Sequence, residues 1–127
     1  MPEPTLTDST EPTLADWARR AAQAADDKLG RDTVGIEGGD VLAITDFFVI
    51  SGGGTVRQGR AIADEVEEQL TLLDGPKPVR VEGRDDYRWV LLDFGGCVVH
   101  LLDEEARAFY DLERLWSDCP RLEWQSA

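Results

Sequence analysis

The stretch VISGGGTVRQGRAIADEVEEQL, Val49 to Leu70, sets the pattern for the middle of the fold. It runs from an apolar, β-branched segment into three consecutive glycines and then into a long charged helix. A strand, a glycine-rich turn and a helix in this order form a phosphate-binding loop, in which backbone N–H groups and the helix N-terminus hold the anion. The first question is therefore whether the protein handles a nucleotide.

The template for a nucleoside triphosphate loop is incomplete in this stretch. Gly54 and Gly59 have the required four-residue gap, but Arg60 and Ala61 stand where the template needs Lys and Ser or Thr. The hydroxyl group that would bind the metal ion is therefore missing.

The dinucleotide fingerprint fails as well, because Gly52-x-Gly54 leads to Arg57 instead of a third glycine. The favoured interpretation is structural: Gly52, Gly53 and Gly54 form a tight turn that needs positive φ angles, with Arg57 and Arg60 in solvent. Transfer of a nucleotidyl group stays open as an alternative.

The composition indicates one globular domain. The chain has 127 residues, of which 42% are hydrophobic and 31% charged. No apolar run approaches the roughly 20 residues of a membrane span. The first residues, MPEPTLTDSTEPT, have neither the basic start nor the apolar middle of a signal peptide. We expect a cytoplasmic protein with no membrane partner.

The charge and the cysteines limit the possible partners. Thirteen basic and 26 acidic residues give a net charge of −13. Nucleic-acid binding depends on Lys and Arg that neutralise phosphates, so no direct, specific nucleic-acid binding is expected. A basic partner fits this charge, although solubility alone would also explain it. Cys97 and Cys119 lack C-x-x-C spacing and form no metal site with the single histidine, so both are expected to be reduced.

The first half of the chain is predicted to form a tail, a helix and a hairpin. Residues 1–12 have the composition of a disordered acidic tail. From Thr13, an N-cap with Asp16 three residues later, LADWARRAAQAADDKLG is alanine-rich and helical, and Gly30 is expected to end it. The segments DTVGIE and VLAITDFFVISG, separated by the turn signal GGD, are predicted to pair as strands.

The second half is predicted to add a helix, three strands and a closing helix. The helix after the glycines places Ile62, Ala63, Val66, Leu70 and Leu73 on one face. The strands are VRVEG, YRWVLLDF and CVVHLLD, and the closing helix is EEARAFYDLERLW.

The closing helix is predicted to pack a stripe of Ala106, Phe109, Leu112 and Trp116 onto the core, and residues 117–127 are expected to be a C-terminal tail. The order α-β-β-α-β-β-β-α over residues 13–116 predicts a single mixed α/β domain, with a mixed five-stranded sheet and flanking helices.

The sequence gives little support to catalysis. Ser51 lacks the Gly-x-Ser-x-Gly elbow of a hydrolase. Nucleotidyl transfer needs clustered carboxylates to hold Mg²⁺, yet the strand after the glycine-led helix reads Arg80-Val81-Glu82. His100 beside Asp93 could act as a general base, but a lone histidine in a strand more often has a structural role.

Three aromatic residues have two interpretations. Trp89, Tyr110 and Trp116 could belong to the core. Aromatic side chains with acidic neighbours are also typical of a protein-binding patch, because Trp and Tyr anchors carry much of the binding energy at interfaces.

Several motifs taken together resemble one known family. WVLLDFGGCVVHLLDEEARAFYDLERLW, preceded by ITDFFVISGG, RQGRAIADEVEE and VEG, is similar to the ribosomal silencing factors, the RsfS or iojap family. The likeness covers roughly Leu14 to Trp116, and it depends on the order of several motifs rather than on one short pattern.

The resemblance implies a nucleotidyltransferase-like fold without the catalytic carboxylates, and a protein that is no enzyme and has no cofactor or metal. It implies that the protein is a homodimer when free. It also implies that the protein binds the large ribosomal subunit through ribosomal protein L fourteen. Joining of the small subunit would then be blocked, and translation repressed when nutrients are limited. An assembly chaperone for the large subunit is a further alternative.

The same resemblance supplies the residues expected at or just behind the L fourteen surface. They are Asp46, Trp89, Asp93, His100, Glu104, Glu105, Arg107, Tyr110, Glu113 and Trp116. Two departures bear on them: Gly96-Cys97 stands where the family usually has an acid and a β-branched residue, and the loop GGGTVRQ is one residue longer than usual.

Overall fold

A computed structural model describes residues 13–38 and 46–125 of the chain. The tail expected at residues 1–12, and most of the turn signal GGD, lie outside the described residues. The first helix, α2 (Leu14–Asp27), begins as the sequence predicts: the Thr13 hydroxyl accepts the Asp16 N–H, and the Asp16 carboxylate accepts the Thr13 N–H. This reciprocal cap fixes where α2 starts.

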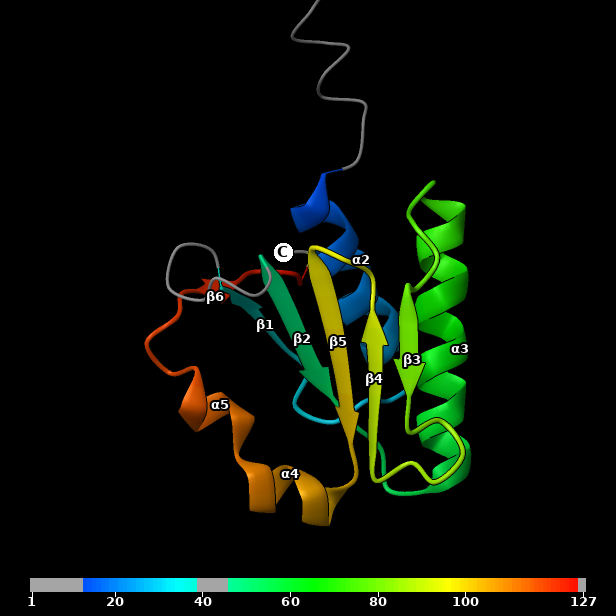
Figure 1. The fold of residues 1–127 in the computed structure, drawn as a ribbon, viewed down its shortest axis with the longest axis vertical. Coiled ribbons are helices and arrows are strands. Elements are labelled where there is room, and N and C mark those ends of the chain that lie inside the picture. Colours follow the sequence, from blue (N-terminus) through cyan, green and yellow to red (C-terminus); the bar gives the residue numbers. More distant parts are fainter. Residues whose placement is uncertain (1–12, 39–45, 126–127) are drawn as a thin grey trace, which may run out of the picture.

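The strands form one mixed sheet in the order β3-β4-β5-β2-β1-β6 (Figure 1). The bounds are β1 (Val34–Glu37), β2 (Phe47–Ser51), β3 (Arg80–Glu82), β4 (Trp89–Asp93), β5 (Cys97–Leu102) and β6 (Arg121–Leu122). Strands β2 and β5 are parallel, and the other neighbours are antiparallel. The predicted hairpin of the first two strands is confirmed.

The sheet has six strands rather than the expected five. Arg121 and Leu122, in the segment expected to be a C-terminal tail, pair with Ile36 and Gly35 of β1. Leu122 is buried against Gly35. A larger residue at position 35 would crowd Leu122, because a Cβ there would lie only 3.1 Å from the Leu122 side chain. A two-residue strand is too short to produce a recognisable alternation in the sequence.

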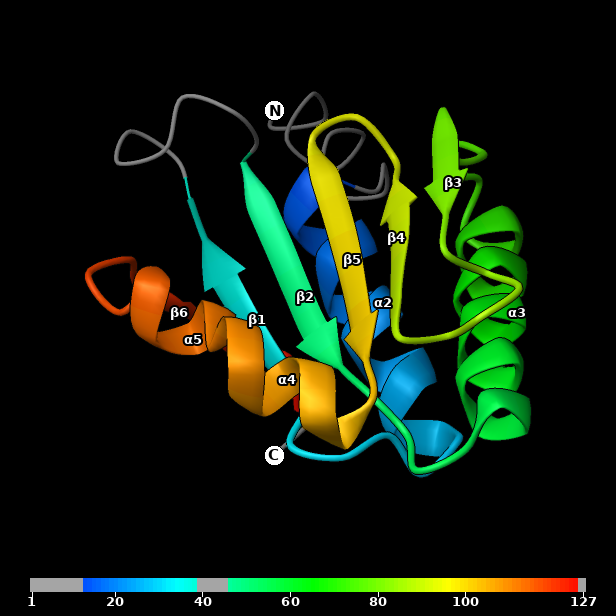
Figure 2. The same ribbon diagram turned by 60° about the horizontal axis from the view of Figure 1, so that its bottom comes forward.

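One face of the sheet is covered by α2 and by α3 (Val56–Leu72), which Figure 2 shows behind and beside the strands. Five alanines of α2 are buried, so the helix can approach the sheet closely. The predicted stripe of α3 is confirmed for Ile62, Ala63, Val66 and Leu70, which are fully buried against the same core. Leu73, expected on the same face, is the C-cap residue after α3 and is half-buried.

The other face is only partly covered, by α4 (Glu104–Tyr110) and α5 (Leu112–Leu115). Figure 2 shows this pair of short helices in front of the sheet, crossing the end where β5 leaves it. Ala106 and Leu112 are buried there against Ile36, Phe48 and Ile50. The sheet surface beyond these helices is left to partly buried side chains such as Trp89 and Leu91.

Three expectations about backbone geometry were wrong. The closing helix is two helices, because Asp111 adopts a left-handed conformation (φ 47°, ψ 53°) between them. Phe109 of α4, expected in the core, is 78% exposed. The helix α2 ends at Asp27, two residues earlier than expected, and the Gly30 N–H donates to the Ala25 carbonyl oxygen at 2.8 Å in the turn that follows.

The third correction concerns the glycine loop. Of Gly52, Gly53 and Gly54, none has a φ in the left-handed region. The first two are required by close approach instead: a Cβ at Gly52 would lie 1.9 Å from the Leu102 carbonyl oxygen, and one at Gly53 would lie 2.6 Å from the Gln58 side chain. The loop therefore needs small residues because β5 and α3 pass close to it.

Candidate functional site

The backbone donors of the glycine loop are already used inside the protein. The Tyr87 hydroxyl accepts the Gly53 N–H and lies 2.9 Å from the carbonyl oxygens of Gly53 and Leu102. Gln58 Oε1 accepts the Gly54 N–H at 2.9 Å. A phosphate at this loop would have to displace both side chains, one of which is buried.

Tyr87 is held in this place by the helix after the loop. A Cβ at Gly59 of α3 would lie 2.4 Å from the Tyr87 ring, so the second glycine of the apparent phosphate motif makes room for an aromatic ring. The sequence pattern therefore has a packing explanation.

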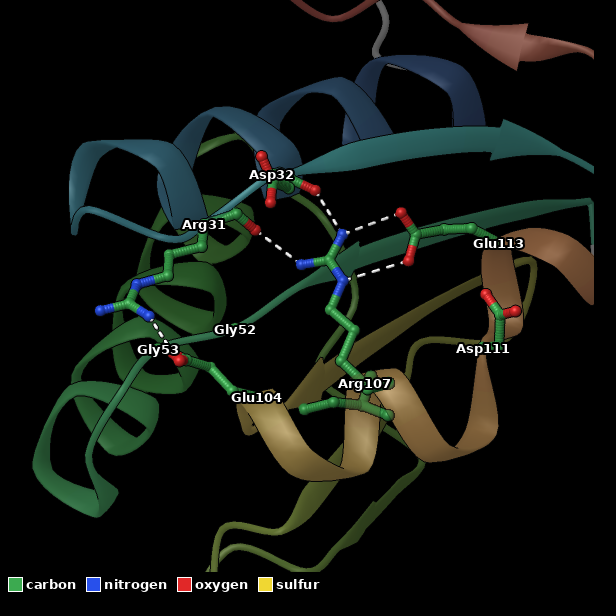
Figure 3. Close-up of a pocket in the computed structure, with 10 residues that line it drawn as sticks. Arg31, Asp32, Gly52, Gly53, Glu104, Arg107, Asp111 and Glu113 are labelled. Carbon is green, nitrogen blue, oxygen red and sulfur yellow. Dashed lines mark hydrogen bonds and ion pairs between the residues drawn. The ribbon is translucent and has the colours of Figure 1, made fainter.

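A solvent-open pocket of about 460 Å³ lies between the glycine loop and α4 (Figure 3). Arg31 and Arg107 are the cationic groups in its wall. Arg31 pairs with Glu104, and Arg107 pairs with Glu113 through two contacts of 3.1 and 3.2 Å. Both guanidinium groups are therefore neutralised by carboxylates within the pocket wall.

Arg107 acts as a brace between distant parts of the chain, as Figure 3 shows. Besides Glu113, its guanidinium donates to the Arg31 carbonyl oxygen at 2.6 Å and to the Asp32 carbonyl oxygen. Its side chain is only 16% exposed. The resemblance places Arg107 at the partner surface, but these contacts use it to fasten α4 and α5 to the loop before β1.

We expect Arg107→Lys to lower the free energy of unfolding by about 2 kcal/mol, because an ammonium group cannot bridge Glu113 and two carbonyl oxygens together. Chemical denaturation measures the change. The control is Arg88→Lys, since Arg88 pairs with Glu105 in solvent at 3.0 Å and should alter stability little. Equal effects of the two substitutions would contradict the brace.

A group of rings lies on the partly covered face of the sheet. We call Phe48, Trp89, His100, Phe109, Tyr110 and Trp116 the aromatic cluster. Trp116 stacks on Phe48 with ring centroids 4.0 Å apart, and Trp89 lies 4.6 Å from Tyr110. Tyr110 in turn meets Phe109 edge to face at 5.0 Å. The cluster runs from the buried sheet surface out to solvent on α4.

Exposure divides the cluster into an inner and an outer part. Phe48 and His100 are buried, Trp89 and Trp116 are half-buried, and Tyr110 and Phe109 are 48% and 78% exposed. The sequence left open whether Trp89, Tyr110 and Trp116 were core or patch. In the structure Trp116 packs onto the core, whereas Tyr110 presents its ring to solvent. Phe109 was missed as a surface residue because helical periodicity placed it inside.

His100 does not form the pair with Asp93 that a general base would require. Its Nδ1 accepts the Trp89 indole N–H at 3.0 Å, while Asp93 Oδ1 accepts the Gly95 N–H at 2.9 Å in the turn after β4. Burial lowers the pKa of His100 to about 4, so the ring is neutral near pH 7.

The low pKa of His100 predicts acid-dependent stability. The unfolded chain takes up a proton near pH 6.5 and the folded protein only near pH 4, so stability falls between these values as the pH falls. Phenylalanine takes up no proton, so His100→Phe should escape this loss. We expect its free energy of unfolding, measured against that of the unaltered protein, to increase by about 2 kcal/mol when the pH is lowered from 6.5 to 4.5. Urea denaturation at both pH values measures this, and a pH-independent difference would contradict it.

The ten residues expected at the partner surface fall into three groups. Trp89, His100, Tyr110 and Trp116 meet in the aromatic cluster. Glu104, Glu105, Arg107 and Glu113 form ion pairs along α4 and α5. Asp46 and Asp93 lie at the end of the sheet away from the start of α4, next to the Phe48 end of the aromatic cluster: Asp93 pairs with Val98, which also pairs with Phe48, and Asp46 directly precedes β2.

The departure at Gly96-Cys97 lies away from the aromatic cluster. A Cβ at Gly96 would lie 2.7 Å from the Leu14 side chain, and Cys97 is buried among the residues that face α2. Burial raises the pKa of the Cys97 thiol to about 12. Cys97 and Cys119 are both free and both buried.

The described residues contain neither a candidate metal site nor a helix that could span a membrane. Within residues 13–38 and 46–125, no three His, Cys, Asp or Glu side chains are grouped so that they could hold a metal ion. Over the same ranges, no helix has the length and apolar character needed to cross a membrane.

The fold and this surface define a small mixed α/β protein that presents aromatic side chains bordered by carboxylates. The family model described as "ribosomal silencing factor during starvation" matches residues 11–127, and the chain belongs to this family.

Three similar proteins illustrate the relationship. The ribosomal silencing factor RsfS of Bacillus subtilis is 38% identical over 100 residues, which cover 79% of this chain and 84% of that protein. A crystal structure of a protein from Chromobacterium violaceum superposes with a TM-score of 0.77 at 28% identity, over 83% of this chain and 87% of that one. The mouse mitochondrial assembly of ribosomal large subunit protein 1 is 34% identical over 68% of this chain and 39% of its own length.

Proposed function

We propose that this protein is a ribosomal silencing factor that docks on the large ribosomal subunit through ribosomal protein L fourteen. Docked there, it blocks joining of the small subunit and represses translation under nutrient limitation. The observation that carries the proposal is the solvent-exposed end of the aromatic cluster, Phe109 and Tyr110, in a chain of this family.

Exposed aromatic side chains on a folded helix favour a protein partner. Tyr110 is fixed from both sides, by Trp89 at 4.6 Å and by Phe109 at 5.0 Å. A ring that is already ordered loses little conformational entropy on binding, and buried aromatic anchors supply most of the affinity at an interface. Leu115 on α5 is also 68% exposed and adds apolar area to the surface of the two short helices.

The charge of the chain supports a basic partner. The net charge is −13, and Glu104 and Glu105 are exposed at the start of α4. Carboxylates around an apolar centre steer a basic ribosomal protein into register and raise the rate of association.

The proposed mechanism is steric and involves no chemical step. The loop that resembles a phosphate site uses its Gly53 and Gly54 N–H groups for Tyr87 and Gln58, which argues against nucleotidyl transfer. Calorimetric titration with ATP and Mg²⁺ is expected to show no heat of binding. Heat together with a transfer product would favour an enzyme instead.

We also propose that the protein acts in the cytoplasm and is a homodimer when free. Analytical ultracentrifugation at micromolar concentration measures the oligomeric state, and a monomer at all concentrations would contradict the dimer.

Reassociation of purified subunits tests the main proposal. An excess of this protein should hold small and large subunits apart in a sucrose gradient run under conditions where they otherwise join. Phe109→Asp should lose this effect, whereas Leu72→Asp, at an equally exposed position of α3, should retain it. Unchanged reassociation in the presence of the unaltered protein would rule out the proposal.

The mouse relative favours a second candidate, because its name describes assembly of the large ribosomal subunit. The protein would then shield a basic ribosomal protein before its incorporation. Capture of free L fourteen without capture of mature large subunits would favour this assembly role over subunit blocking.

A further inference from the structure

His100 is a polar side chain in a strand that is otherwise apolar. All six residues of β5 are buried, and the neighbours of His100 on the same face are Val98 and Leu102. The His100 ring lies beside the stacked pair of Phe48 and Trp116, at centroid distances of 5.7 and 5.5 Å. An apolar side chain of similar shape would satisfy this environment.

Placing a histidine here has an energetic cost. Because Nδ1 accepts the Trp89 indole N–H, the neutral ring carries its proton on Nε2. This Nε2 is buried and has no hydrogen-bond partner in the described part of the chain. A buried donor without an acceptor destabilises the folded state. Packing and stability therefore do not explain why this residue is a histidine.

The one polar contact that His100 makes in the described residues is the bond to Trp89, at 3.0 Å. Trp89 is half-buried at the start of β4 and pairs with Leu102 across the sheet. Without an acceptor for its N–H, the indole would be held by packing alone. With the acceptor, the plane of the ring is set, and the same ring packs on Tyr110 of α4.

We propose that His100 is a positioning residue for docking: its Nδ1 orients the Trp89 indole, and Trp89 orients the exposed Tyr110. The contacts run from a rigid central strand to a solvent-exposed ring through one hydrogen bond and one ring contact. Docking then begins from an ordered surface, which reduces the entropy lost on binding. His100 itself, 5% exposed, does not touch the partner. This inference rests on the proposed function.

Two substitutions at position 100 separate positioning from packing. His100→Phe keeps a ring beside Phe48 and Trp116, and it removes both the acceptor and the unpartnered N–H. His100→Asn loses the ring but keeps an acceptor oxygen close to the position of Nδ1. If His100 only filled the core, His100→Phe would be more stable than His100→Asn and would also bind large subunits more tightly.

We expect the two properties to move in opposite directions. His100→Phe should be at least as stable as the unaltered protein in thermal unfolding, yet bind purified large subunits about fivefold more weakly. His100→Asn should be less stable and recover most of the lost affinity. The Trp89 indole N–H resonance, identified with Trp89→Phe, should shift in His100→Phe and stay close to its original position in His100→Asn.

Specific results would overturn the inference. If His100→Phe binds large subunits as tightly as the unaltered protein, or if affinity only follows stability in both variants, His100 is not a positioning residue. An unshifted Trp89 resonance in His100→Phe has the same meaning. If the unaltered protein itself does not bind large subunits, the proposed function fails, and the resonance still decides whether His100 orients the indole.

Discussion

Trp89→Ala is expected to weaken binding to large ribosomal subunits about 100-fold while the protein stays folded. The substitution removes the half-buried indole that packs on Tyr110, and it leaves His100 Nδ1 without its donor. The loss should exceed that of an ordinary surface truncation because the exposed ring of Tyr110 loses its support at the same time. Co-sedimentation with purified subunits over a range of concentrations measures the affinity.

The matched control for Trp89→Ala is Leu72→Ala. Leu72 is 71% exposed at the end of α3, away from the aromatic cluster, so its truncation should leave the affinity unchanged. Circular dichroism establishes that both variants are folded. If folded Trp89→Ala bound large subunits as tightly as the unaltered protein, the aromatic cluster would not be part of the docking surface.

Gly52→Ala is expected to cost roughly 4 kcal/mol or more of folding free energy. The new methyl carbon would lie 1.9 Å from the carbonyl oxygen of Leu102, which is a backbone atom between two paired strands and cannot swing aside. The Tyr87 hydroxyl, 3.2 Å from the same position, would also be displaced from the loop. Equilibrium denaturation, or the yield of folded protein, measures the effect.

Gly54→Ala is the control within the same loop. A methyl group there would meet only the end of the Arg31 side chain, at 3.2 Å, and this flexible group can move. Stability should therefore change little. If both alanines were tolerated equally, the account of the loop as a close-packing turn would be wrong.

The two glycine substitutions show where sequence reasoning was sound and where it failed. The pattern of strand, glycines and helix predicted β2, a turn and α3 correctly. The reason given for the glycines, positive φ, was wrong, because the constraint comes from Leu102, about 50 residues later in the chain. A local pattern reports that a residue must be small and does not report which distant atom makes it so.

The prediction of a single closing helix was wrong for a related reason. The periodicity of residues 104–116 is helical throughout, and the break at Asp111 has no glycine or proline to mark it. The brace from Arg107 to Glu113, Arg31 and Asp32 is formed across this break. Phe109 lies before the break on the exposed side of α4, and Leu112 lies after the break and is buried.

The resemblance supplied the residues expected at the docking surface as a set, and the sequence could not assign a role to each of them. Motif order supplied Trp89, His100, Arg107 and Tyr110 without distinguishing contact from support. Burial and hydrogen bonding make that distinction: Tyr110 is exposed, Trp89 is half-buried, and His100 and Arg107 are largely buried and bonded within the protein.

Local patterns in the sequence were sufficient for the N-cap of α2, most of the apolar face of α3, the first hairpin and the family. These features depend on residues within a few positions of one another, or on the order of motifs along the chain. Three further features needed the folded chain: the sixth strand, the break at Asp111 and the exposure of Phe109. Each depends on contacts between segments far apart in sequence, and no local periodicity encodes which segments will meet.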